Sequence, residues 1–211
     1  MSKLKAITSV RNVRRYGKPI VFLVCLYPAA WLALQWYFAY TGQPHGLGFN
    51  FFEFTNRTTG EWALRYLLVA LAVTPVAKLT KSFKPILFRR MLGLFAFFYV
   101  TIHMCSYVFL DLEGNMAEFI EAIAERLFIT VGMLAFVLLI PLAATSFDKA
   151  QHWLGLERWR KLHKLVYIIT PLGILHFYMM QKTTTPEPFI YLGIYILLMA
   201  IRYLDKRRAK A

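Results

Sequence analysis

The stretch LFITVGMLAFVLLIPLAATSF, residues 127–147, decides the fold class of this chain. Its 21 residues include no Asp, Glu, Lys or Arg. A helix needs about 20 consecutive apolar residues to cross the hydrocarbon core of a bilayer. The stretch therefore predicts a membrane-spanning helix, because a single segment in lipid must satisfy its own backbone hydrogen bonds.

Five further apolar segments resemble this one. The chain of 211 residues is 58% hydrophobic and 17% charged, and its apolar residues fall in blocks. We expect an all-α membrane protein whose six helices span about residues 19–40, 62–79, 90–110, 127–147, 163–180 and 188–204. The second, fifth and sixth segments are short, so they need amphipathic ends or a locally thinner bilayer. Only short loops remain, which predicts a single domain over residues 1–211.

The distribution of charge predicts how the helices are oriented. When the ends and loops are taken alternately, 21 of the 25 Lys and Arg residues fall on one side and eight of the 11 acidic residues on the other. This is the positive-inside pattern, and it predicts that both termini are cytoplasmic. The net charge of +14 then reflects topology and contact with membrane lipid rather than nucleic-acid binding.

The first apolar segment is predicted to be a retained helix. It is longer than the apolar region of a signal peptide, which has roughly 7–15 residues. Cys25 and Cys105 both lie in apolar segments, so we expect neither a disulfide nor a metal cluster from them.

Three histidines lie in or beside apolar segments: His103, His163 and His176. An ionisable side chain at membrane depth is costly and usually functional, and imidazole is a common ligand of haem iron. His103 and His176 each lie ~20 Å along their helix from its cytoplasmic end, at 1.5 Å per residue. The spacing therefore predicts two facing imidazoles that can hold a haem iron in the outer half of the bundle.

His163 lies at the cytoplasmic mouth of the fifth helix, where the matching position on the third helix is Arg89 or Arg90. A second haem there would have one histidine ligand, with His152, water or a shared arrangement as its partner. On an ideal helix His163 and His176 point ~140° apart. Either Pro171 unwinds the helix enough to bring both inward, or only His176 faces the bundle.

Other features admit two interpretations. Arg57, Arg65 and Arg126 either pair with haem propionates or extend toward the membrane interface.

His45 and His152 are expected in solvated loops. Residues 41–60 are expected to form an outer loop, and residues 116–126 a short amphipathic helix on the outer surface. Prolines 75, 141 and 171 lie inside predicted helices, where neighbours can satisfy the freed carbonyls.

The residues around the histidines form a wider pattern, which comprises Gly60-Glu61-Trp62-Ala63-Leu64, Thr74-Pro75, Arg89-Arg90-Met91-Leu92-Gly93-Leu94, His103, Tyr107, Ala144-Thr145-Ser146, Leu154-Gly155, Trp159, Leu162-His163-Lys164-Leu165-Val166-Tyr167 and His176. Over roughly residues 45 to 205 this pattern resembles the MsrQ (YedZ) family, the haem-binding membrane subunits of bacterial methionine sulfoxide reductase systems. That family belongs to the ferric-reductase-like transmembrane superfamily.

The resemblance implies an inner-membrane subunit that passes electrons outward to MsrP, a periplasmic molybdopterin enzyme that repairs methionine sulfoxide in proteins. It implies haem b and FMN as cofactors, and the quinone pool or a cytosolic flavin reductase as electron donor. The family's histidine positions fall on His103, His163 and His176. Larger relatives carry two histidines on the third helix and this chain carries one, so the number of haems stays open at one or two.

The residues agree with an electron-transfer subunit that leaves substrate chemistry to a partner. The chain has no dinucleotide fingerprint and no Gly-rich phosphate loop, so a quinone or another protein must supply electrons. Two alternatives remain: a stand-alone ferric or oxygen reductase of the same fold, and a haem-free transporter with relay histidines.

Overall fold

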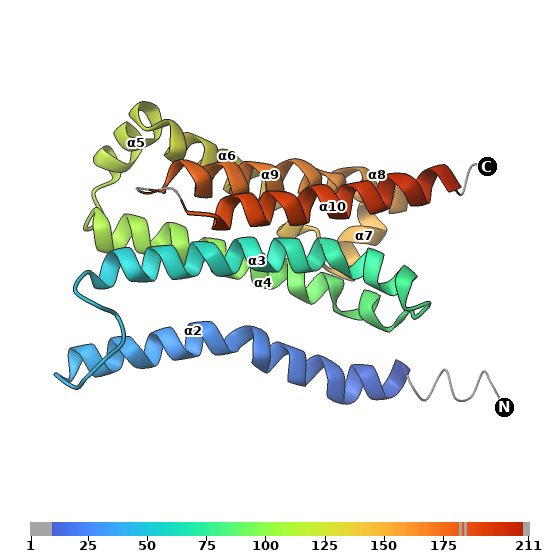
Figure 1. Cartoon of the computed structure of the whole chain (residues 1–211), viewed down its shortest axis with the longest axis horizontal. Helices are drawn as coiled ribbons and strands as arrows, with labels where there is room; N and C mark the ends of the chain where they lie inside the picture. The colour runs from blue at the N-terminus through green and yellow to red at the C-terminus, as the bar shows by residue number, and fades with distance from the viewer. Residues whose placement is uncertain (1–9, 182, 184, 209–211) are drawn as a thin grey trace.

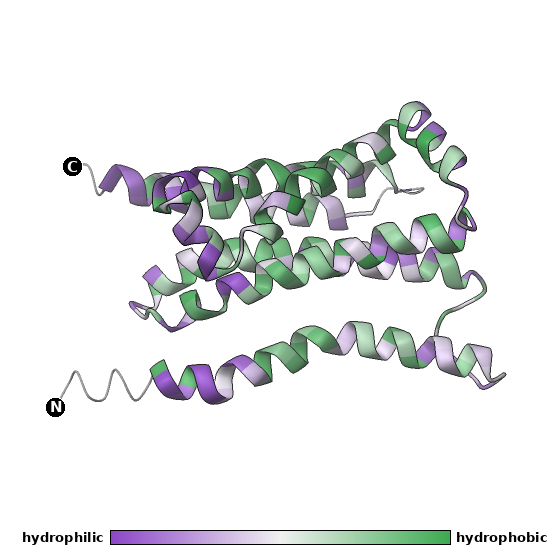
Figure 2. Ribbon diagram, turned by 180° about the vertical axis from the view of Figure 1, so that it is seen from behind, coloured by the Kyte–Doolittle hydropathy of each residue, from purple (hydrophilic) through white to green (hydrophobic). Residues whose placement is uncertain are grey.

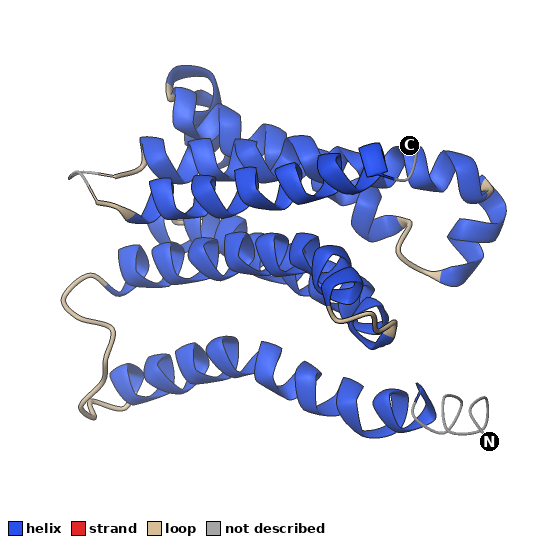
Figure 3. Cartoon of the chain, turned by 45° about the vertical axis from the view of Figure 1, so that its right-hand side comes forward, coloured by secondary structure: helices blue, strands red, loops and turns tan. Residues whose placement is uncertain are grey.

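The computed structural model describes residues 10–181, 183 and 185–208, and within them every regular element is a helix (Figure 1, Figure 3). Six helical spans are long and apolar enough to cross a membrane, as the sequence predicts. Lys3, Lys5, Lys182 and Lys210, which belong to the predicted charge pattern, lie outside the described residues.

The spans are built on six long helices: α2 (Lys18–Tyr40), α3 (Phe51–Leu79), α4 (Arg89–Ser106), α6 (Leu127–Ala144), α9 (Val166–Met179) and α10 (Glu187–Arg208). Short elements flank them: η1 (Val13–Gly17), η2 (Lys84–Phe88), η3 (Tyr107–Asp111), α5 (Met116–Glu125), α7 (Asp148–Leu154), α8 (Leu156–Leu162) and η4 (His163–Leu165). The start of α2 and the end of α10 lie at the same end of the bundle (Figure 1). Hydrophilic residues gather near the two ends, and hydrophobic residues dominate the length between them (Figure 2).

Helix α3 begins earlier than the sequence suggested. It starts at Phe51 rather than near residue 62, so half of the expected outer loop 41–60 is helical. The reason is a cap: the Asn50 side chain accepts a hydrogen bond from the Glu53 backbone N–H at 3.0 Å. Asn followed three residues later by Glu is a helix-start signal, and here it extends the helix through polar residues beyond the apolar block.

Two prolines lie inside bundle helices, Pro75 in α3 and Pro171 in α9, and α10 satisfies the carbonyls that they free. Pro75 cannot donate to the Leu71 carbonyl four residues earlier, and the Arg202 guanidinium donates to that carbonyl instead. Pro171 likewise frees the Tyr167 carbonyl, to which the Tyr195 hydroxyl donates at 2.8 Å. This confirms the expectation that neighbouring helices compensate prolines in a membrane bundle.

Helix α2 lies apart from the other spans over most of its length and is held at its own proline, Pro28 (Figure 1). The Tyr99 hydroxyl accepts from the Ala29 N–H at 3.0 Å and donates to the Cys25 carbonyl at 2.8 Å. The Tyr66 hydroxyl also donates to that carbonyl, at 3.1 Å. Two tyrosines from α3 and α4 therefore complete the backbone hydrogen bonding of α2 where the proline interrupts it.

At the end of the bundle away from the two termini, α5 confirms the predicted short amphipathic helix. The Asn115 side chain accepts from the Glu118 N–H at 3.2 Å, which repeats the cap seen at Asn50. At the opposite end, α7 and α8 meet at Gly155, whose φ of 74° is a left-handed conformation that favours glycine. These short helices place His163 at the start of the span that continues into α9.

Candidate functional site

His103 on α4 and His176 on α9 meet in the half of the bundle that lies toward α5, away from the two termini. Their ring centroids are 6.0 Å apart and their planes cross at 76°. Both side chains are half-buried. The structure thus brings together the two histidines that the matched spacing predicted to face one another.

Each of these rings is oriented by a backbone carbonyl on a neighbouring helix. His103 Nδ1 lies 2.9 Å from the Asn56 carbonyl oxygen on α3, and His176 Nδ1 lies 2.7 Å from the Phe128 carbonyl oxygen on α6. A carbonyl oxygen can only accept, so each Nδ1 carries the proton and donates it. The Nε2 atoms of both rings therefore keep their lone pairs, and these are free for a metal ion.

The distance between the ring centres equals that expected for two imidazoles whose Nε2 atoms point at one ion. With metal–nitrogen bonds of ~2 Å, as for zinc, and ~1.1 Å from nitrogen to ring centre, an ion held by two imidazoles would place their centroids ~6 Å apart. The observed separation is 6.0 Å. The ring atoms nearest to Gly60 on α3 and Gly132 on α6 are Nδ1, Cε1 and Cγ, so Nε2 is turned away from these helices.

His163 lies in a different environment at the other end of the bundle. Its Nε2 is 3.1 Å from the Thr145 hydroxyl oxygen, and its ring stacks on Trp159 at a centroid distance of 4.1 Å. Thr145 donates its single hydroxyl hydrogen to the Pro141 carbonyl at 2.6 Å. The hydroxyl therefore accepts from His163, so Nε2 carries the proton in this arrangement, the reverse of the other two rings.

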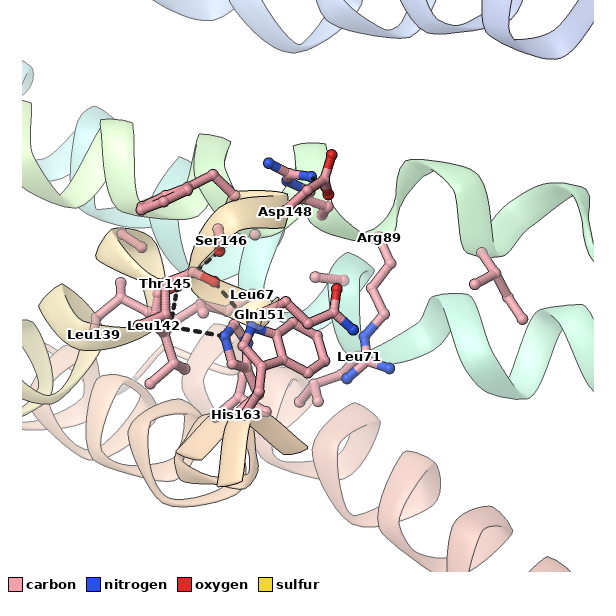
Figure 4. Close-up of a pocket in the computed structure, with 18 residues that line it drawn as sticks. Leu67, Leu71, Arg89, Leu139, Leu142, Thr145, Ser146, Asp148, Gln151 and His163 are labelled. Atoms are coloured by element: carbon pink, nitrogen blue, oxygen red, sulfur yellow. Dashed lines mark hydrogen bonds and ion pairs between the residues drawn. The ribbon is translucent and has the colours of Figure 1, made fainter. Parts of the chain in front are cut away.

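A cavity of about 350 Å³ opens beside His163 (Figure 4). Leucines and alanines of α3 and α6 form an apolar wall, and polar groups from α4, α7 and the end of α6 also line the cavity. Arg89 lies on one side of the cavity and Thr145 and His163 lie on the other, with the Gln151 side chain extending between them (Figure 4). A mostly apolar cavity with a few convergent polar groups is the usual form of a small-molecule site.

The start of the fifth span explains how His163 and His176 can both face the bundle, although on an ideal helix they would point ~140° apart. His163–Leu165 form a 3₁₀ turn before α9 begins, so the helix between His163 and His176 is not ideal. His163 lines the inner cavity while His176 faces His103. Both side chains therefore face the bundle, and the local change in helix type contributes, because a 3₁₀ turn rotates the chain further per residue.

The remaining candidates are placed as follows. Arg57 and Arg65 both pair with Glu61 at 2.9 Å, and Arg65 also donates to the Tyr191 hydroxyl. Arg126 is exposed at the start of α6. His152 is exposed on α7 and does not line the cavity, and His45 contacts Phe51. Cys25 and Cys105 are free thiols.

Comparison with known proteins places this geometry in a family. Residues 59–174 match the family described as the ferric reductase like transmembrane component. The chain is 48% identical over 188 residues to the heme-binding subunit MsrQ of protein-methionine-sulfoxide reductase from Polaromonas naphthalenivorans, which covers 88% of this chain and 83% of that relative. The MsrQ proteins of Caulobacter vibrioides and Xanthomonas euvesicatoria are 43% and 42% identical over 204 and 196 residues, covering 97% and 92% of this chain and 93% and 88% of the relatives.

The chain belongs to the MsrQ family. Membership agrees with the sequence resemblance and with the six spans, which make it a multi-pass membrane protein. MsrQ relatives with these names are bacterial proteins.

Some contacts of the two facing histidine rings in this MsrQ-family chain were not predicted from the sequence. Gly60 and Gly132 lie directly against the two facing rings, and the Asn56 and Phe128 carbonyls fix their tautomers. Small residues on interior faces of membrane helices were the available signal. The carbonyl partners carried no signal, because every residue has one.

Proposed function

We propose that this chain is an electron-transfer subunit in which His103 and His176 hold one haem b through their Nε2 atoms. The observation that supports this proposal best is that the His103 and His176 rings face one another, with both Nδ1 protons donated to carbonyls and both Nε2 lone pairs free. When bound, the haem supplies a one-electron iron couple inside the bundle. The MsrQ relatives are named heme-binding subunits, which agrees with this role.

The orientation of the bundle in the membrane is inferred from the charge pattern. We place the end that carries η2, α7 and α8 in the cytoplasm of a bacterial inner membrane, because Lys and Arg concentrate there. The His103–His176 pair then lies nearer the periplasm. Electrons would leave on that side for the molybdopterin enzyme MsrP, which the family resemblance implies as partner in the repair of oxidised periplasmic proteins.

The electron donor would act at the inner end. The cavity beside His163 is large enough for the ring of a quinone, and its apolar wall suits a ligand that arrives from the lipid. A cytosolic flavin reductase is the other donor that the family implies, and the exposed Arg89 is where an FMN phosphate would find a cation. His163 stays a proposed second haem ligand, and in the described arrangement its free nitrogen is Nδ1.

A difference spectrum tests the haem proposal. Purified full-length protein, reduced minus oxidised, should show a b-type α-band that disappears in His103→Ala and His176→Ala. Absence of any α-band in the wild-type protein would instead favour a haem-free transporter. If the reduced haem is reoxidised by ferric chelates or oxygen as fast as by MsrP, the stand-alone reductase is favoured.

A filled cavity tests the donor end. Gly93 lines the cavity and a Cβ there meets no atom within 4 Å, so Gly93→Leu should occupy the space without distorting α4. Gly193→Leu on α10 is the matched control, because its Cβ also meets nothing within 4 Å and it lies away from the cavity.

Quinol-driven reduction of the haem should fall at least about tenfold in Gly93→Leu but not in Gly193→Leu, because a filled cavity excludes the quinol ring. Reduction by dithionite should be unchanged in both. Unchanged quinol-driven reduction would remove the quinone from this cavity. Dependence on added flavin reductase would then assign the donor to that protein.

A further inference from the structure

The two facing histidines are held by the same local structure, which occurs twice. On α3, the Asn56 carbonyl that takes the His103 Nδ1 proton lies four residues before Gly60. On α6, the Phe128 carbonyl that takes the His176 Nδ1 proton lies four residues before Gly132. In each case the ring comes from the next long helix of the pair, α4 for α3 and α9 for α6.

The glycines make room for the rings. A Cβ on Gly60 would lie 3.0 Å from His103 Nδ1 and 3.1 Å from its Cε1. A Cβ on Gly132 would lie 2.9 Å from both His176 Nδ1 and its Cε1. The contact at Gly132 requires a shift, and the contact at Gly60 requires the ring to give by a few tenths of an ångström, so in both cases the added Cβ presses on the Nδ1 edge that donates to the carbonyl.

We propose that Gly60 and Gly132 are positioning residues that seat each imidazole against a backbone carbonyl and thereby direct both Nε2 atoms to a shared iron. A backbone carbonyl bonded to Nδ1–H fixes the tautomer and raises the basicity of the coordinating nitrogen. A more basic imidazole favours ferric over ferrous iron, so this structure lowers the reduction potential. The seating of the rings stands on the structure alone, whereas the shared iron and the redox consequence rest on the haem function proposed above.

The first test reads the ring tautomers without any haem. Full-length apoprotein labelled with ¹⁵N-histidine should show His103 and His176 as Nδ1–H tautomers and His163 as an Nε2–H tautomer. Signals are assigned by single His→Gln variants. An Nε2–H tautomer at His103 or His176 would overturn the proposal, even if the protein binds haem normally.

The second test uses Gly60→Ala and Gly132→Ala in the haem-loaded protein. Alanine favours the helix more than glycine, so loss of helix is not the expected effect. Each variant should lose about tenfold in haem affinity, with Gly132→Ala the more affected because its contact is closer. A tenfold weaker preference for ferric haem appears as a potential ~59 mV more positive.

Two matched glycines control for packing. Gly193→Ala adds a Cβ with no atom within 4 Å, and Gly173→Ala, on the same helix as His176, adds one in ordinary contact with Leu64 at 3.5 Å. Both should keep the wild-type potential and the wild-type low-spin ferric EPR spectrum, which depends on the angle between the two ring planes. If Gly60→Ala and Gly132→Ala match these controls in potential and EPR spectrum, the positioning role is wrong. Should either variant fail to fold, the tautomer test decides alone.

Discussion

The two ends of the bundle, which we propose to be the outer and the inner end, both carry histidines packed against a neighbouring helix, but the rings leave different nitrogens free. At the outer end, His103 and His176 donate Nδ1–H to carbonyls and keep Nε2 free. At the inner end, His163 donates Nε2–H to Thr145 and faces a cavity that also holds Arg89. The residue type is the same, and the hydrogen-bond partner of the ring decides which nitrogen is available.

This difference supports the proposal that His103 and His176 hold a haem and that the cavity beside His163 receives the electron donor. Two free Nε2 atoms at 6.0 Å between ring centroids suit an iron ligated from both sides. A single ring stacked on Trp159 and bonded to a hydroxyl suits a polar contact at the edge of an apolar cavity. Substitutions at each end show whether the two ends can be disturbed independently.

The largest effect is expected from the outer pair. His103→Ala or His176→Ala should remove at least roughly nine-tenths of the outer haem, because loss of a ligand exceeds the 10–100-fold loss typical of its hydrogen-bond partners. Haem content per protein and the α-band measure this. Membrane insertion should be retained, as judged from expression and helicity. Full α-band intensity in either variant would separate the pair from haem binding.

A smaller effect is expected from His163. His163→Ala should leave the outer α-band and its potential unchanged but slow donor-driven reduction of the haem, because the residue lines the inner cavity. Stopped-flow reduction by the donor, compared with reduction by dithionite, measures the slow step. Equal donor-driven rates in variant and wild type would make His163 a structural residue only.

Substitution of Thr145 is expected to slow donor-driven reduction of the haem less than substitution of His163 does. Thr145→Val keeps the side-chain shape but leaves His163 Nε2–H without its acceptor, a loss of about 1–3 kcal/mol for a buried group. Donor-driven reduction should slow by roughly tenfold or less, whereas Thr145→Ser should retain the wild-type rate. A Thr145→Ser variant as slow as Thr145→Val would attribute the effect to packing rather than to the hydroxyl.

The outer acidic loop is expected to change rates by a few-fold only. Glu113, Glu118 and Glu121 are exposed, and replacing them with Gln should slow transfer to a basic partner at low salt by about two- to fivefold. The difference should vanish at high salt, because screening removes steering. Glu157→Gln, an exposed residue at the inner end, is the control. A rate without salt dependence would place the docking surface elsewhere, for example on residues 41–60.

The smallest effect is expected from His152. His152→Ala should change haem content by less than about a tenth, because the residue is exposed on α7 and does not line the cavity. Pyridine haemochrome assays measure haem per protein. Loss of one of two haems in this variant would assign His152 as the partner of His163 and revise the inner end as a metal site.

The sequence by itself determined the membrane fold and the depth of the histidines. Apolar blocks such as residues 127–147 predicted the six spans, because backbone buried in lipid must satisfy its own hydrogen bonds within a helix. The helical rise of 1.5 Å per residue placed His103 and His176 at the same depth. It did not determine where α3 begins, because the Asn50 cap acts outside the apolar block. The length and composition of an apolar segment predict which residues are buried in the membrane. The residue at which the helix begins depends separately on local capping hydrogen bonds.

Only the tertiary structure decided which nitrogen each histidine presents. The partners are carbonyls of Asn56 and Phe128 and the hydroxyl of Thr145, contributed by other helices 47, 48 and 18 residues away in sequence. Gly60 and Gly132 matter because another helix brings a ring against them, which helix periodicity alone does not reveal. Hydrogen bonds between helices depend on interatomic distances to within tenths of an ångström. The sequence gives the spacing of residues along each helix, but it does not give the distance at which two helices pack.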